Sequence, residues 1–437
     1  MIFPLVFSTK APIIVPIKQK RLEIFMMIAA VIAEYNPFHN GHAYQLKEIR
    51  RQTGADLILV MMSGDFVQRG APSCVDKYAR CRMALAAGAD MVCELPVYGA
   101  IGSAEIFAES AVSLLNRLGC IDYLCFGAET IAPSLFDAII PILSDEPDEY
   151  KAFLQAGLKT GMNFPAARSR ALYSILGDAQ CSDILNQPNN ILAIEYMKAL
   201  YKSGSTIRPF PIRRSGAGYH STDTDVGFCS ATAIRRQLSK NLFSPETVIR
   251  ALDIPDTSKA ILQDYLADYP VLTRNDFSDI LAAHLLDTRT SLTDYTDITP
   301  DLANRIDSFR YQFLSVEQFM TLLSARNLTA TRIGRCLFHI ILEHRKSHLD
   351  TWKAHQYAGY LRVLGFKKSS GRLWKAIDPT FRDCMITRTS EVSGRLSEIG
   401  YASYEAELYA SRLYRQILRN RSLKNLPDIT SEPVILI

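Results

Sequence analysis

A length of 437 residues predicts two or three domains, and a composition of 48% hydrophobic and 22% charged residues predicts a globular chain with a sizeable core. The formal net charge is only +4, which excludes a globally basic nucleic-acid binder and leaves any such signal to a local segment. Nine scattered cysteines without a CxxC pair match neither a zinc framework nor a fully paired secreted scaffold, so we expect a reducing cytoplasm.

Residues 1–26 combine apolar side chains with lysines and three prolines. A signal peptide is excluded because Lys10 breaks the apolar stretch and no small-residue cleavage site follows. We interpret this segment as an N-terminal extension, with translation starting at Met26 or Met27; a functional tail is the alternative. No later segment reaches the ~18 uninterrupted apolar residues of a membrane span, so we expect no membrane partner.

From residue 27 onward, short apolar runs alternate with stretches of helical periodicity. Met27–Ala33 predicts a strand buried on both faces, because the run is unbroken and rich in β-formers. The alternation continues with a helix at Ala43–Gln52, a strand at Leu57–Met62, a helix at Lys77–Ala87, a strand at Met91–Leu95, a helix at Ala104–Leu118 and a strand at Tyr123–Phe126. Strands joined by helical crossovers predict an α/β fold with a Rossmann-like parallel sheet.

The middle of the chain is predicted to be mainly helical over residues 130–203, with a strongly periodic segment at Ile191–Tyr201. Thr206–Arg213 predicts a further strand, and Ser215–Tyr219 a glycine-rich loop that leads to a helix at Ser230–Leu238.

We place a domain boundary near residue 250, which separates an α/β domain over 27–250 from an α-helical domain over 251–437. Beyond the boundary helical patterns dominate and clear βαβ units are absent. Arg326–Lys375 contains eleven Lys or Arg residues and two acidic ones, a local charge of +9. This segment is the candidate for binding a polyanion.

The most informative stretch is Ala33–His42, AEYNPFHNGH, at the junction of the first strand and the first helix. The carboxyl edge of an open parallel sheet is where ligands bind, and free N–H groups at a helix start favour an anion. Gly41 lets a nucleotide approach the backbone, and His39 and His42 can both face a phosphate. The alternative is that both imidazoles only cap the helix. Since a reaction at an α-phosphate mainly needs charge stabilisation, we predict both histidines to be catalytic.

This stretch resembles the (H/T)xGH motif of the nucleotidylyltransferase superfamily. Ser230–Arg235, SATAIR, resembles the second signature of that superfamily, ISSTxxR, whose hydroxyls and arginine hold the β- and γ-phosphates. Taken alone, SATAIR also fits an ordinary Ser-capped helix.

Nearly the whole chain is similar to the bacterial tRNA(Met) cytidine acetate ligase family. The additional matching motifs are MSGDFVQRG (Met62–Gly70), ELP (Glu94–Pro96), FGAE (Phe126–Glu129), PNNILAIEY (Pro188–Tyr196) and GAGYH (Gly216–His220). The resemblance implies that the enzyme activates acetate with ATP as acetyl-adenylate and then acetylates the wobble cytidine of elongator tRNA(Met). Two alternatives remain: a small-molecule nucleotidylyltransferase that transfers AMP to a phosphate-bearing metabolite, and a non-catalytic tRNA-binding protein with a regulatory nucleotide pocket.

The resemblance also implies a set of ATP-binding residues. They are Ile32, Ala33, Glu34, Tyr35, Asn36, Pro37, Phe38, His39, Asn40, Gly41, His42, Ala43, Tyr44, Gln45, Gly127, Asn189, Arg214 and Ser215. Gly127 falls where a closely packed nucleotide needs no side chain. Asn189 has the alternative role of a helix N-cap, and Arg214 that of a solvated charge at a strand end.

Further phosphate contacts are predicted for Ser230, Thr232, Arg235 and Lys77. Gln68–Gly70 and Lys77 follow the second strand and are candidates for binding acetate or pyrophosphate; a surface loop and an exposed helix face are the alternatives. Mg²⁺ is expected to accompany ATP, with Asp65 as a candidate for binding it through water. No set of protein metal ligands is predicted.

Contact with tRNA is predicted in the basic segment, and no obligate protein partner is expected. The candidate residues are Arg332, Arg335, Arg345, Lys346, Lys353, Lys367, Lys368 and Arg372, with Trp352, Tyr357 and Trp374 as aromatics that can stack on unpaired bases. The alternative is a solvated helical face whose aromatics lie in the core. The histidines of this segment lack partners at ligand spacing, so no metal site is predicted there.

Overall fold

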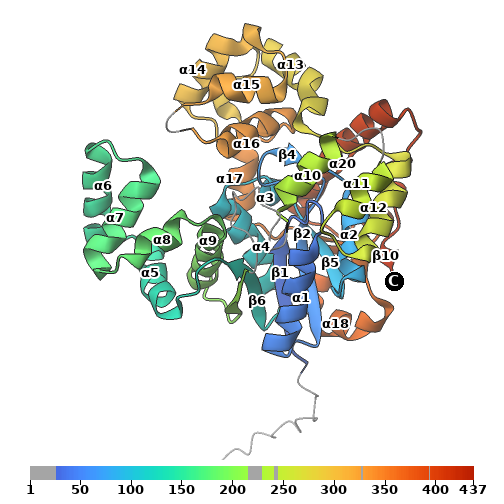
Figure 1. Cartoon of the computed structure of the whole chain (residues 1–437), viewed down its shortest axis with the longest axis horizontal. Helices are drawn as coiled ribbons and strands as arrows, with labels where there is room; N and C mark the ends of the chain where they lie inside the picture. Colours follow the sequence, from blue (N-terminus) through green and yellow to red (C-terminus); the bar gives the residue numbers. More distant parts are fainter. Residues whose placement is uncertain (1–25, 215–228, 241–244, 326–327, 393) are drawn as a thin grey trace, which may run out of the picture.

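The computed structural model describes residues 26–214, 229–240, 245–325, 328–392 and 394–437 (Figure 1). Within these ranges the centre of the molecule is an eight-stranded sheet of order β10-β8-β5-β2-β1-β6-β7, with β9 paired to β8 outside this path. The strands are β1 Ile28–Ala33, β2 Leu57–Ser63, β5 Met91–Leu95, β6 Tyr123–Ala128, β7 Arg208–Arg213, β8 Leu361–Phe366, β9 Met385–Ile386 and β10 Ile435–Leu436. A separate hairpin of β3 (Phe66–Val67) and β4 (Ala71–Pro72) follows β2.

The predicted parallel order is confirmed, because β1 pairs in parallel with both β2 and β6, and β2 with β5. The predicted strand at Thr206–Arg213 is β7, which pairs in parallel with β6. Pro209 and Pro211 are tolerated there because β7 ends the strand order and is therefore an edge strand.

The strands are buried on both faces, as the unbroken apolar run in β1 predicts. Ala29 and Val31 point into one core, whereas Ile28, Ala30 and Ile32 point into the other, since successive side chains of a strand alternate. The first core is covered by α1 Asn40–Thr53, α2 Lys77–Ala86, α10 Ala231–Lys240, α11 Pro245–Ala251 and α12 Asp256–Asp268. The second is covered by α4 Ala104–Leu118, α9 Pro188–Lys202, α18 Gly371–Ala376 and α19 Pro379–Arg382.

Four helices between β6 and α9 form a lobe that stands beside the sheet, which we call the helical arm (Figure 1). They are α5 Pro133–Asp145, α6 Asp148–Lys159, α7 Phe164–Leu176 and α8 Gln180–Asn186. The arm has a core of its own, which α9 joins through Ile194. The predicted helical character of residues 130–203 is confirmed.

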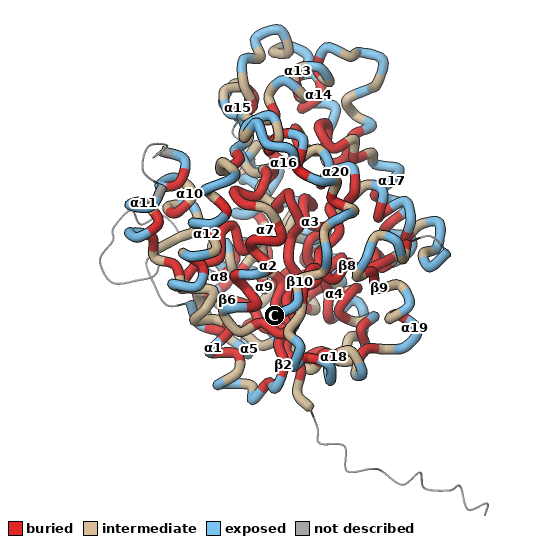
Figure 2. The backbone as a smooth tube through the Cα atoms, turned by 90° about the vertical axis from the view of Figure 1, so that its right-hand side faces the viewer, coloured by how far each residue is buried: buried red, intermediate tan, exposed pale blue. Residues whose placement is uncertain are grey.

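The C-terminal part is mainly helical, as predicted, and its helices α13 to α16 and α20 share a third core with the short helix α3 (Val97–Ala100). Its elements are η1 Arg274–Phe277, α13 Ser278–Leu286, η2 Leu292–Asp294, α14 Pro300–Phe309, η3 Arg310–Gln312, α15 Val316–Leu323, α16 Ala330–Ile341, α17 Lys346–Ala354, η4 Lys368–Ser370, η5 Thr389–Glu391, α20 Glu398–Ser422 and η6 Ile429–Ser431. Figure 2 shows the buried backbone concentrated at the centre and exposed turns around α13, α14 and α19.

One feature of the C-terminal part differs from the expectation of an α-helical domain. The strands β8, β9 and β10 join the same sheet as β1, and β8 pairs antiparallel to β5. No local pattern indicated the run LRVLGF of β8, since its partner β5 lies far away in the sequence and the next strand along the chain, β9, has only two residues. The sheet therefore contains strands from both sides of the boundary predicted near residue 250.

Two buried cations organise the carboxyl edge of this sheet. Arg80 of α2 is fully buried and donates to the carbonyl oxygens of Glu34 (2.7 Å), Ser63 (3.0 Å) and Gly64. It also donates to the carbonyl of Val75 at 3.1 Å and to the hydroxyl of Ser73 at 3.2 Å. All five N–H groups of the guanidinium are thus used, and they tie the loop after β1 to the loop after β2.

Lys77, one turn earlier, is also fully buried. Its Nζ lies 2.6 Å from Glu94 Oε1 and 2.7 Å from Ser411 Oγ, with carboxylate oxygens of Asp65 and Glu407 at 3.5 and 3.6 Å. Burial and the nearby Glu94 raise the pKa of Glu407 well above its usual value. The ammonium thus joins α20 to the sheet edge.

We predict that Lys77→Met lowers the free energy of unfolding by about 3–5 kcal/mol, because it leaves buried carboxylates without their cation. Urea unfolding of the variant and of Lys47→Met, a control on the exposed side of α1, measures the difference. Equal stabilities of the two variants would contradict the role of this cluster.

Candidate active site

The two histidines of HNGH lie at the start of α1, at the carboxyl edge of the sheet. His39 is the N-cap residue, and its Nδ1 accepts a hydrogen bond from the backbone N–H of Gly41 at 3.1 Å. His42 Nδ1 accepts from the backbone N–H of His39 at 3.2 Å. The rings stack with centroids 3.6 Å apart. The capping role considered as an alternative is thus real, but it occupies only one nitrogen of each ring.

These hydrogen bonds fix the protonation of both rings. Burial, and then the nearby charge of Arg214, lower the pKa of His39 to about 3. Burial, His39 and Arg214 lower the pKa of His42 well below its usual value. Both imidazoles are therefore neutral at pH 7. Because each Nδ1 accepts, each Nε2 carries the proton, and neither Nε2 has a partner among the described residues. The pair offers two N–H donors.

Part of the predicted ATP-binding loop packs against the buried side of the histidine pair. The rings of Tyr35 and Phe38 are fully buried, 4.7 Å apart, and lie 4.7 and 5.5 Å from the ring of His42. Asn36 is buried and accepts the N–H of Cys74 at 2.8 Å. The side chains of Tyr35, Asn36 and Phe38 therefore point into the protein, and the contact of these residues with ATP stays a prediction.

Gly127, Asn189 and Arg214, which are far apart in the sequence, come together beside this pair. Arg214 Nη1 donates to Asn189 Oδ1 at 3.2 Å, and a Cβ at Gly127 would lie 3.2 Å from Arg214 Cγ. The stem of Arg214 therefore covers Gly127. Asn189 is not the N-cap of α9, since its Nδ2 donates to Glu129 Oε1 at 2.5 Å and the cap position is Gln187.

Glu129, the acid of the FGAE motif, was not predicted as a site residue. Its carboxylate accepts the backbone N–H groups of Asn189 at 3.3 Å and Asn190 at 3.1 Å at the start of α9. A carboxylate at a helix N-terminus complements the helix dipole. Glu129 thereby fixes the position of Asn189 next to Arg214.

The SATAIR helix, α10, lies against the same loop. Arg235 donates from Nη1 to the carbonyl of Asn36 at 2.6 Å and from Nη2 to Thr232 Oγ1 at 3.0 Å. Ser230 Oγ accepts the N–H of Ala233 at 3.2 Å, as in a capped helix. Arg235 also lowers the pKa of His39, after burial and Arg214, so its charge reaches the histidine pair. Ser215 and Gly216–His220 lie outside the described residues.

Asp253 is a further residue that the motifs did not reveal. Its Oδ1 accepts from Asn40 Nδ2 at 2.5 Å, and its Oδ2 accepts the N–H of Cys229 at 2.7 Å. It thus joins the first residue of α1 to the segment that begins α10. No local pattern marks this aspartate, which lies near the predicted domain boundary.

Several predicted contacts are corrected. Lys77 is enclosed by its carboxylates, so the prediction that it contacts phosphate is wrong, as is the alternative of an exposed helix face. Asp65 is buried beside Lys77 rather than open to a metal ion. The N–H of Gln68 is held by Glu34 Oε1 at 3.1 Å. Gly70 has a φ of 62° and presses against the backbone of α16, so only glycine fits there.

The basic segment does not form one surface. Arg332 and Arg335 lie on α16, which contacts Gly70 at the carboxyl edge of the sheet, and both face Asp297 at 3.5 and 3.0 Å. The other candidates at this end already have partners within the protein. Arg345 lies over the ring of Tyr295 and pairs with Glu343, and Lys346 donates to the carbonyl of Ile298 at 3.0 Å.

Three further basic candidates lie at the opposite edge, whereas Lys353 lies on α17. The last residue of β8, Phe366, pairs with the first residue of β5, so Lys367, Lys368 and Arg372 follow at the amino edge of the sheet. Roughly 15 Å of strand separates the two edges. Trp352 and Tyr357 are buried, which contradicts their predicted stacking on bases.

Among the described residues, no group of three or more His, Cys, Asp or Glu side chains is arranged to hold a metal ion. None of the described helices combines the length and apolar character that crossing a membrane requires.

A parallel α/β sheet with a capped HNGH turn at its carboxyl edge, flanked by arginines, defines an HxGH-type nucleotidylyltransferase site. The family described as HIGH Nucleotidyl Transferase matches residues 26–427. A tRNA(Met) cytidine acetate ligase of Thermoanaerobacter sp. (strain X514) is 37% identical over 92% of this chain and 98% of its own, and one of Clostridium perfringens is 34% identical over 94% and 100%.

Solved structures agree with these sequence matches. The crystal structure of apo Thermotoga maritima TmcAL has a TM-score of 0.86 at 28% identity, over 94% of this chain and 100% of that one. The same protein bound with alpha-thio ATP has a TM-score of 0.83. The chain belongs to the tRNA(Met) cytidine acetate ligase family.

We predict that Arg214→Gln weakens the binding of an ATP analogue about ten- to hundred-fold, because it removes a charged hydrogen-bond donor beside the histidine pair. Arg213→Gln, an exposed neighbour at the end of the same strand, is the matched control. Calorimetric titration of both variants measures the effect, and equal affinities would contradict the placement of Arg214 at the phosphates.

A second prediction concerns stability at acidic pH. Between pH 6.5 and about 3 the unfolded chain protonates His39 and the folded chain does not, so stability is lost as the pH falls below 6.5. Each such histidine contributes a slope of about 1.4 kcal/mol per pH unit. Urea unfolding from pH 7.5 to 5 should show a smaller slope for His39→Gln than for His355→Gln, an exposed control. Identical slopes would contradict the buried neutral state of His39.

Proposed function

We propose that this protein is an ATP-dependent acetate ligase that forms acetyl-adenylate and acetylates the wobble cytidine of elongator tRNA(Met), giving N-acetylcytidine. The observation that carries the proposal is the pair of neutral imidazoles at the start of α1, whose Nε2–H groups have no partner in the part of the chain that the structure describes. The relatives that bear this name cover almost the whole chain, which favours this activity over AMP transfer to a metabolite.

In the first step an oxygen of acetate attacks the α-phosphorus of ATP, the bond to the bridging oxygen of pyrophosphate breaks, and pyrophosphate leaves. Negative charge shifts onto the non-bridging and leaving oxygens. His39 and His42 donate Nε2–H groups to these oxygens, and the free N–H groups of α1 add to the positive field. Arg214 and Arg235 hold the outer phosphates.

Burial, followed by Arg214, lowers the pKa of His39 to about 3, so the neutral ring serves as a hydrogen-bond donor through Nε2–H. The neutral ring of His39 keeps its Nε2–H as a hydrogen-bond donor while the charge on the phosphate changes.

In the second step the exocyclic amine of cytidine attacks the acetyl carbonyl, the bond from that carbon to the phosphate oxygen breaks, and AMP leaves while the amine loses one proton. The cytidine must therefore reach the carboxyl edge of the sheet. Arg332 and Arg335 of α16 are the predicted tRNA contacts at this edge, whereas Lys367, Lys368 and Arg372 can only meet a distant part of the tRNA.

Mg²⁺ would accompany ATP in this proposal, and its charge would offset the charge of the pyrophosphate. We assign it no protein ligands, since Mg²⁺ bound through substrate phosphates keeps much of its water. We place the enzyme in the cytoplasm, where its nine free thiols stay reduced.

Incubation with ATP, labelled acetate and elongator tRNA(Met), followed by nucleoside analysis, tests the proposal. We expect His42→Ala to lose at least a hundred-fold in acetate-dependent pyrophosphate release, by analogy with the loss of an oxyanion donor, while its circular dichroism remains native. His355→Ala, at an exposed position, should retain full activity. Near wild-type activity of His42→Ala would refute the site.

A further inference from the structure

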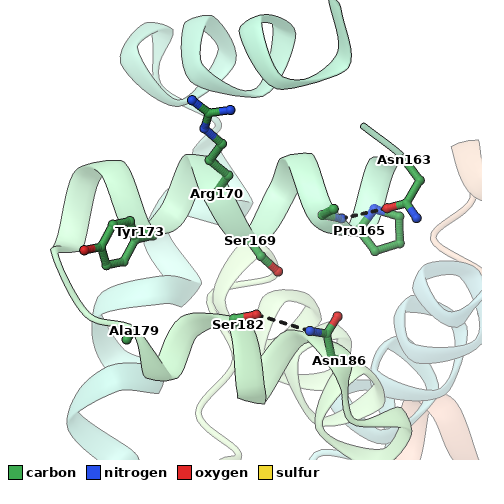
Figure 3. Close-up of a pocket in the computed structure, with 9 residues that line it drawn as sticks. Asn163, Pro165, Ser169, Arg170, Tyr173, Ala179, Ser182 and Asn186 are labelled. Atoms are coloured by element: carbon green, nitrogen blue, oxygen red, sulfur yellow. Dashed lines mark hydrogen bonds between the residues drawn. The ribbon is translucent and has the colours of Figure 1, made fainter. Parts of the chain in front are cut away.

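A groove in the helical arm has no role in the steps above. It has a volume of about 550 Å³ and lies between α7 and α8 (Figure 3). The residues that line it are Asn163, Pro165, Ala166, Ser169, Arg170, Tyr173, Ala179, Ser182 and Asn186. Most of these side chains are polar. Two neighbouring helices of one small lobe would be expected to pack through apolar side chains instead.

The spacing of these residues shows that each helix turns a whole face towards the groove. Ala166, Ser169, Arg170 and Tyr173 follow the i, i+3, i+4, i+7 pattern of one helix face, and Ser182 and Asn186 are one turn apart on α8. The apolar faces of both helices pack instead into the core of the arm. The polar faces are therefore not needed to hold the arm together.

Ser169 gives the most specific sign of a ligand. Its side chain is 8% exposed, and its Oγ has no hydrogen-bond partner among the described residues. In Figure 3 the hydroxyl points into the gap between α7 and α8. A buried hydroxyl without a partner costs about 1–3 kcal/mol, so a ligand that bonds to it gains that amount.

Further unused hydrogen-bonding groups lie near Ser169, although the side chain of Arg170 extends away from the gap that the Ser169 hydroxyl faces (Figure 3). Arg170 has no ion-pair partner among the described residues, whereas the nearby Arg168 faces Glu195 at 3.4 Å. Ser182 Oγ accepts from Asn186 Nδ2 at 3.2 Å, which leaves the hydroxyl hydrogen and Asn186 Oδ1 free. The Tyr173 ring is 53% exposed at the rim. No carboxylate lines the groove.

We propose that this groove binds an unpaired nucleotide of the RNA substrate, an inference that rests on the proposed function. An exposed aromatic ring offers a stacking platform, amides and hydroxyls pair with the edge of a base, and an unpaired guanidinium suits a phosphate. The position fits as well: Asn186 precedes Asn189 by three residues, so their Cα atoms are at most about 11 Å apart. The arm thus holds RNA beside the ATP site.

The test measures binding of an unmodified elongator tRNA(Met) transcript to the full-length protein by fluorescence anisotropy at several salt concentrations. We expect Tyr173→Ala to raise Kd about ten-fold through lost stacking, and Arg170→Gln to lower the salt slope by about one. Ala179→Leu, which fills the groove from an exposed position immediately before α8, should also weaken binding. Acetate-dependent exchange of pyrophosphate into ATP should stay at the wild-type rate in all three variants.

Matched controls are Tyr311→Ala, an 84% exposed tyrosine outside the arm, and Lys151→Gln, an exposed cation on α6. Wild-type affinity for the tRNA in both Tyr173→Ala and Ala179→Leu would overturn the inference. It would also be overturned if Lys151→Gln lost as much tRNA affinity as Arg170→Gln. If the groove variants had the tRNA affinity of the wild type but a different sedimentation coefficient, the inference would also be overturned, and the groove would be an interface between protein molecules. Absence of acetate-dependent exchange in the wild type would refute the proposed function, while the tRNA titration would still decide the groove.

Discussion

The site depends on one buried guanidinium. Arg80 fixes the carbonyl oxygens of Glu34, Ser63 and Gly64, which belong to the two loops that leave the sheet at β1 and β2. Loop carbonyls that are buried must be hydrogen-bonded, and a single side chain with five donors satisfies several of them at once. With these carbonyls held, the chain after β1 can turn into α1 at a fixed place, and the histidine pair takes its position from that turn.

The same edge combines two electrostatic environments that are kept apart. Below the loops, Lys77 and its carboxylates form a closed network with no exposure to solvent. On the other side of the loops, the histidine pair and the arginines that influence it present donors. The two carboxylates near them are held by other groups: Asp253 by Asn40 and the N–H of Cys229, and Glu129 by Asn189 and Asn190. A polyphosphate would be repelled by the acids of the first environment and attracted by the second. Because these acidic side chains are gathered around Lys77, the potential around the histidine pair stays positive.

The helical arm and the C-terminal helices extend this edge in two directions. The arm leaves the sheet after β6 and returns at α9, whose first turn is fixed by Glu129. The C-terminal part returns through β8 and contributes α16 against Gly70. A large RNA that delivers one base to a small site needs contacts at a distance from that site, and we propose that these two extensions supply them.

The sequence by itself determined the strands of the parallel sheet, the histidine turn and the helical character of the rest, because each depends on local periodicity and on residues adjacent in the chain. It did not reveal the neutral state of the two histidines, the burial of Lys77 or the roles of Glu129 and Asp253, which arise from contacts with residues far away in the sequence. Only the tertiary structure placed β8 antiparallel beside β5 and so moved Lys367 and Lys368 to the edge opposite the histidines. A run of charges fixes how many cations a segment carries, whereas the direction of a strand in the sheet decides which face of the molecule receives them.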